Sequence, residues 1–98
     1  MNNNTNDLPT KIIKLLQQVK KPINLDTLKE ELKKQNYSEF EINFALDIIF
    51  ENEMIIFRGL HGYMDLQPKI RIILEKYPDI NYNQLETYWN DPEFEADV

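Results

Sequence analysis

Carboxylates and a single histidine are the side chains of this sequence that could do acid–base or metal chemistry. His61 stands between two glycines, and acidic pairs such as Glu51 with Glu53 occur in the second half of the chain. A zinc site of the usual kind needs several Cys or His ligands, but the chain has no cysteine and no second histidine. No nucleophile motif accompanies His61, and neither phosphate-binding glycine motif occurs. We therefore expect no catalytic residues, no metal or other cofactor, no small-molecule substrate and no enzyme activity.

A longer stretch, SEFEINFALDIIFENE at residues 38–53, combines five acidic side chains with apolar residues and contains no Lys or Arg. Ser38 and Glu41 match the S-x-x-E capping box, which predicts the start of a helix. Apolar residues that recur every three or four positions define its core side: Ile42, Ala45, Leu46 and Ile49. At about 100° per residue the opposite side consists of Phe40, Phe44, Asp47 and Glu51, flanked by Ile48.

The same periodicity predicts two helices before this stretch. The first carries its apolar side chains on one face, at Leu8, Ile12, Leu15, Leu16 and Val19. The helix is expected to end before Lys20, and Pro22-Ile23-Asn24 forces an extended link, in which Ile23 can form one short strand pairing. Asn24 or Asp26 caps the second helix, which ends at Gln35-Asn36. Its inward residues are Leu25, Leu28 and Leu32.

After residue 53 the pattern changes to that of a β-hairpin. The segments MIIFRG and GYMDL flank a turn that contains the only two glycines of the chain. Pro68 then opens a fourth helix, which Pro78 stops and which faces inward through Ile70, Ile73, Leu74 and Tyr77. Asn83, with Glu86 three residues on, predicts the cap of a short fifth helix. We expect Trp89 to close the core and Phe94 to be an exposed anchor.

The composition fits one soluble domain, with 98 residues, 42% hydrophobic and 29% charged. No apolar run approaches the roughly 20 residues that cross a bilayer, and residues 1–7 lack the features of a signal peptide. A cytoplasmic location is expected. Residues 1–7 are expected to be disordered and residues 91–98 to form an acidic tail. The net charge is +3 over residues 1–37 and −9 over residues 38–98, so most of the molecule would repel a polyanion.

The order of elements resembles the winged-helix branch of the helix-turn-helix superfamily over residues 8–67. The resemblance is carried by Leu28, Leu32, the turn Asn36-Tyr37-Ser38, the core side of the third helix and the hairpin at 54–66. It implies a mostly α fold with a small antiparallel β-hairpin. The two carboxyl-terminal helices at 68–90 lie beyond the resemblance and are expected to pack on the domain or to dimerise. In that family the third helix normally enters the DNA major groove, and the hairpin, or wing, touches a minor groove or phosphates.

The outward residues of the third helix argue against DNA reading in this chain. A helix that reads bases supplies Arg, Lys, Asn or Gln, whereas this one supplies Phe40, Phe44 and Ile48 with the acids Asp47 and Glu51. An aromatic patch rimmed by charge is typical of a protein-binding surface. The sequence therefore predicts a noncatalytic module for protein–protein interaction or assembly, whose partner is apolar with a basic rim.

Three coverings of Phe40 and Phe44 remain open: the carboxyl-terminal helices, a second copy of the chain, or another protein. The alternative function is a DNA-binding transcriptional regulator that uses the second helix and the wing. Its contacts would come from Lys29, Lys33, Lys34, Arg58 and His61. These lysines, with Lys11, Lys14, Lys20 and Lys21, are more simply interpreted as a solvated outer face.

Overall fold

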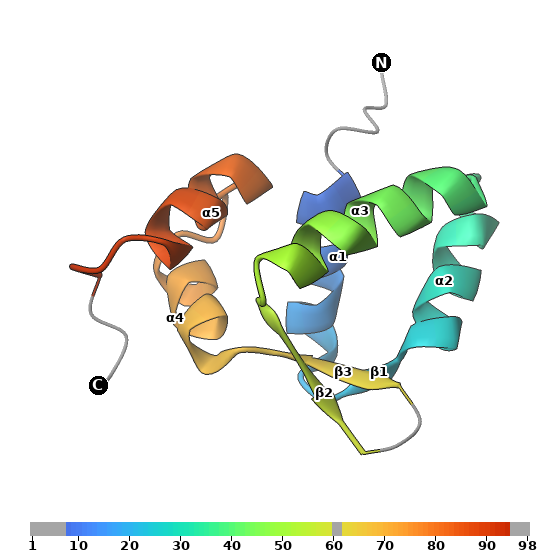
Figure 1. Cartoon of the computed structure of the whole chain (residues 1–98), viewed down its shortest axis with the longest axis horizontal. Helices are drawn as coiled ribbons and strands as arrows, with labels where there is room; N and C mark the ends of the chain where they lie inside the picture. Colours follow the sequence, from blue (N-terminus) through green and yellow to red (C-terminus); the bar gives the residue numbers. More distant parts are fainter. Residues whose placement is uncertain (1–7, 60–61, 95–98) are drawn as a thin grey trace.

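The computed structural model describes residues 8–59 and 62–94 and shows a mostly α-helical fold with a small antiparallel sheet (Figure 1). The helices are α1 (Leu8–Val19), α2 (Leu25–Lys34), α3 (Glu39–Glu51), α4 (Pro68–Lys76) and α5 (Tyr82–Trp89). The strands are β1 (Ile23–Asn24), β2 (Ile55–Arg58) and β3 (Tyr63–Leu66). The prediction of a mostly α fold with a small antiparallel β-hairpin is confirmed. Two predictions, the tail at 1–7 and the role of His61, lie outside the described residues, as does the acidic tail beyond residue 94.

The sheet has the strand order β1-β3-β2, with β3 in the centre. The predicted short pairing at Ile23 is present as β1, whose Ile23 and Asn24 lie opposite Met64 and Tyr63, and Ile55 of β2 lies opposite Leu66. Gly59 and Gly62 have φ angles of 75° and 73°, which side chains with a Cβ adopt only at a cost. The two glycines therefore hold the hairpin turn as predicted.

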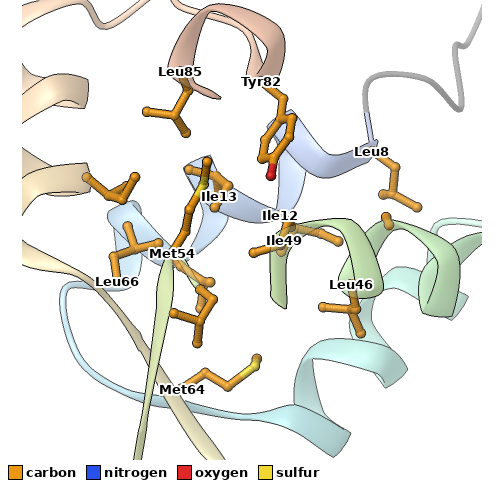
Figure 2. Packing of buried hydrophobic residues seen from close by; sticks show 14 of the residues in the cluster. Leu8, Ile12, Ile13, Leu46, Ile49, Met54, Met64, Leu66, Tyr82 and Leu85 are labelled. Atoms are coloured by element: carbon orange, nitrogen blue, oxygen red, sulfur yellow. The ribbon is translucent and has the colours of Figure 1, made fainter. Parts of the chain in front are cut away.

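One hydrophobic core joins all five helices to the hairpin (Figure 2). In Figure 2, Tyr82 and Leu85 of α5 point toward Ile13 of α1 and Met54, which precedes β2. The prediction for the first helix was wrong in detail, because Ile13 is buried while Leu15 and Val19 are only partly so. The reason is that α1 packs against both α3 and α5, which widens and turns its buried face. None of the helices in the described ranges is long and apolar enough to span a membrane.

The cap of the carboxyl-terminal helix lies two residues earlier than predicted. Asn81, not Asn83, is the cap: its side chain accepts from the backbone N–H of Gln84 at 2.9 Å, and the Gln84 side chain accepts from the Asn81 N–H at 3.1 Å. A contact with α1 favours this start of the helix, because the backbone N–H of Tyr82 donates to Thr10 Oγ1 at 2.7 Å. This bond ties the first turn of α5 to α1.

Phe94 is not the exposed anchor that was predicted. Its ring is partly buried and lies 5.6 Å from the ring of Tyr88, with the Lys76 ammonium 5.2 Å above it. Tyr77, predicted to face inward, is 41% exposed and stacks on Tyr88 at 4.8 Å. Trp89 is partly buried against the core, and its indole N–H donates to the Asn52 carbonyl at 2.7 Å.

Asp65 of β3 links the hairpin to α4, because it accepts a hydrogen bond from the Arg71 guanidinium. Burial would raise the pKa of Asp65, but the hydrogen bond and charge of Arg71, the Leu66 N–H and Arg58 together hold this pKa below its ordinary value. A lowered pKa contributes stability that is present above the unfolded-state value of about 3.9 and is lost as pH falls through the folded-state value. We therefore expect D65N to lose stability relative to wild type near neutral pH, and this difference to shrink as pH falls below about 4. Thermal denaturation of both proteins across this pH range measures it; a constant difference would contradict the assignment.

Candidate functional site

The rotation of α3 decides which of its side chains are available to a partner. The four residues predicted to face the core are all buried: Ile42, Ala45, Leu46 and Ile49. The start of the helix is held by both bonds of the predicted capping box, from the Ser38 N–H to Glu41 Oε1 at 2.8 Å and from the Glu41 N–H to Ser38 Oγ at 3.1 Å. The predicted orientation of the helix is confirmed.

Phe40 and Phe44 lie on the outer side of α3 and are the two most exposed large hydrophobic side chains among the described residues. Phe40 is 78% exposed and Phe44 is 60% exposed. Their rings stack on each other, with centroids 6.3 Å apart and planes 14° apart. Covering of this pair by the carboxyl-terminal helices, one of the three alternatives, is therefore wrong.

α5 stops short of the phenylalanine pair because it is anchored at the other end of α3. The side-chain amide of Asn52, which follows α3, donates to Tyr82 Oη at 2.8 Å and to Glu86 Oε2 at 3.1 Å. Burial raises the pKa of the Tyr82 hydroxyl, which donates to the Ile48 carbonyl at 3.4 Å. Figure 1 shows α5 beside the carboxyl-terminal end of α3, away from the end that α2 approaches.

Ile48 therefore belongs only in part to the outward surface that was predicted. Its side chain is partly buried against the core, and it lines a shallow hollow together with Pro9 and Tyr82. Asp47 and Glu51 are both exposed. The outward face of α3 thus consists of Phe40 and Phe44 in its first half and of Asp47 and Glu51 in its second half.

The charges on α3 are favourable at its start and unfavourable at its end. Glu39 and Glu41 lie in the first turn, where the helix dipole favours anions, and Glu39 also approaches Lys33 at 3.7 Å. The last turn contains no basic residue. Neither Asp47 nor Glu51 is within ion-pair distance of a Lys or Arg among residues 8–59 and 62–94. Two carboxylates four positions apart repel each other by roughly 0.2–0.5 kcal/mol. The negative charge at this end of the helix is therefore not balanced by a cation of the described residues.

The residues of the DNA-binding alternative are partly engaged within the chain. Arg58 Nε lies 3.4 Å from Asp65 Oδ2, and Lys33 faces Glu39. Lys29 is partly buried, and Lys34 is exposed. His61 lies outside the described residues. Two of the four described cations thus already face a carboxylate of the same chain.

An additional aromatic pair was missed by the sequence analysis. The rings of Phe50 at the end of α3 and Phe57 on β2 lie 5.3 Å apart, and Phe57 is 52% exposed. The signal for it was the strand alternation, which places Phe57 on the same side of β2 as the buried Ile55. The described residues contain no group of three or more His, Cys, Asp or Glu that could hold a metal ion.

No protein-family model, curated protein or solved structure matches this chain.

Proposed function

We propose that this chain is a noncatalytic winged-helix module that binds a protein partner through the outward face of α3. The observation that carries the proposal is the exposed, stacked pair Phe40 and Phe44 on the helix that a DNA-binding winged-helix protein would insert into the major groove. The winged-helix class is supported by the element order α1-β1-α2-α3-β2-β3 and by the antiparallel strand order β1-β3-β2.

The magnitudes support protein binding over DNA binding. Removing a phenylalanine side chain from water contributes about 1.5–3 kcal/mol, so the pair supplies enough free energy for a specific, modest-affinity contact. In contrast, Asp47 and Glu51 would be brought toward phosphates, where each carboxylate opposes the counterion release that drives nonspecific affinity. The same face is favourable for a protein partner and unfavourable for a nucleic acid.

The first test is a titration with duplex DNA at about 50 mM and about 150 mM salt. We expect no saturable binding at either salt concentration, measured by fluorescence anisotropy of a labelled duplex. A steeply salt-dependent affinity that disappears in K29E/K33E would favour the regulator alternative and overturn the proposal.

The positive test is affinity capture with wild type, F40A/F44A and Y63A. Tyr63 is 43% exposed on β3, so Y63A removes one exposed aromatic ring away from α3. We expect partners to be retained by wild type and Y63A and lost by F40A/F44A, at equal folded fractions by circular dichroism. An unchanged set of partners on F40A/F44A would contradict the proposal.

A further inference from the structure

The outward face of α3 also indicates what kind of element the partner presents. Phe40, Phe44, Asp47 and Glu51 follow one another at steps of four, three and four residues, so they form one line along the helix. At a rise of 1.5 Å per residue this line is roughly 17 Å long. The contact surface is therefore a narrow, convex ridge of side chains.

This ridge offers no backbone hydrogen-bonding groups to a partner. The N–H and C=O groups in the interior of α3 are bonded within the helix. An extended peptide lying on the ridge would lose water from its own backbone groups without gaining partners for them, which is costly. A helix satisfies these groups internally, and its rows of side chains fit around a ridge of residues four apart. The ridge therefore fits a helix.

The two halves of the ridge require different chemistry from that helix. Phe40 and Phe44 require apolar side chains. Asp47 and Glu51 lie where the dipole of α3 is negative and where its last turn has no basic residue, so they favour a cation from outside. A Lys or Arg of the partner at this end interacts favourably with the negative end of the helix dipole and reduces the repulsion between the two carboxylates.

A second copy of the chain does not supply this chemistry. Two copies of α3 packed together would bring like charges face to face, since its four acidic residues have no basic counterpart in the helix. α1 is basic and α2, with three lysines and three acids, is neutral, and both bury their apolar faces in the core, with Ile12 and Leu28 both 0% exposed. Two aromatic side chains supply at most about 300–500 Å² of contact, well below the roughly 800 Å² per partner of a stable interface, so this pair alone does not hold a permanent homodimer.

We infer that the partner of α3 is a basic amphipathic helix, with apolar side chains on Phe40 and Phe44 and with Lys or Arg beside Asp47 and Glu51. This inference rests on the proposed function, because it names the partner of the same surface. The small contact area makes the complex transient rather than permanent.

The experiment titrates the full chain with a synthetic amphipathic helix of about 14 residues made of Leu and Lys, long enough to cover the ridge. Calorimetry at about 150 mM salt limits long-range attraction, because the Debye length is then about 8 Å. We expect saturable binding that F40A/F44A weakens at least about tenfold and that Y63A leaves unchanged. A Ser/Lys peptide of equal charge is expected to bind at least about tenfold more weakly than the Leu/Lys peptide.

Charge reversal provides the matched control for the electrostatic half of the ridge. D47K/E51K is expected to lose affinity for the Leu/Lys peptide and to gain it for a Leu/Glu peptide, with a melting temperature no lower than that of wild type. Equal affinity of wild type and F40A/F44A for the Leu/Lys peptide would overturn the inference, as would tight binding of wild type to the Leu/Glu peptide. A wild-type dimer in sedimentation that F40A/F44A dissociates, without peptide binding, would overturn the inference and leave the proposed surface standing.

Discussion

Replacing Ile49 by alanine is expected to lower the free energy of unfolding by about 2–5 kcal/mol. Ile49 is fully buried on the inner side of α3, so the substitution removes apolar contacts and leaves a cavity in the core. Phe44→Ala on the outer side of the same helix is the matched control. Because Phe44 is 60% exposed, we expect its removal to change stability by less than about 0.5 kcal/mol. Urea denaturation followed by circular dichroism measures both values.

This pair of substitutions tests the rotation of α3, on which the binding surface depends. Phe44 is the larger side chain, so a simple loss of apolar volume would make F44A the more damaging change. Only the orientation of the helix reverses that order. If F44A proves more destabilising than I49A, the outward face has been assigned to the wrong residues and the proposed partner surface fails with it.

The orientation of α3 could be predicted because its signals are local. The capping box lies within four residues, and the buried positions repeat within the helix itself. The hairpin was predicted for the same reason, since Gly59 and Gly62 occupy positions where φ is positive. The rotation of α3 predicts only that Phe40 and Phe44 point away from the core of the domain. Whether another part of the chain covers them depends on where α5 docks, which no local pattern specifies.

The docking of α5 depends on contacts between residues far apart in the sequence. Tyr82 bonds to Thr10, which is 72 positions away, and Trp89 bonds to the carbonyl of Asn52. Two asparagines stand near the start of α5, and each is followed three residues later by Gln or Glu. Capping chemistry alone could not choose between them. The choice was made by packing of Tyr82 in the core, and the same packing fixes α5 at the end of α3 that lacks the phenylalanine pair.

Replacing Leu85 by alanine is expected to destabilise the protein by about 2–5 kcal/mol and to release α5 first. Leu85 is 1% exposed, whereas α5 has only eight residues and is too short to persist without packing. Trp89 is the only tryptophan, so its fluorescence reports the docking of this helix. We expect its emission to shift to the red in L85A at urea concentrations where the helical circular dichroism is mostly retained. Thr87→Ala is the control, because Thr87 is exposed and its hydroxyl bonds only within α5.

Release of α5 is expected to change the proposed surface by exposing Ile48. When α5 is docked, Tyr82 bonds to the Ile48 carbonyl and the Ile48 side chain is partly buried, so the apolar part of the ridge ends at Phe44. Undocking would add Ile48 to the exposed apolar line four residues beyond Phe44. L85A is therefore expected to bind apolar helices less selectively than wild type, with a weaker requirement for Lys over Glu in the peptide. If L85A and T87A show the same tryptophan emission and the same unfolding midpoint, α5 is not held by this packing and the boundary of the ridge has another cause.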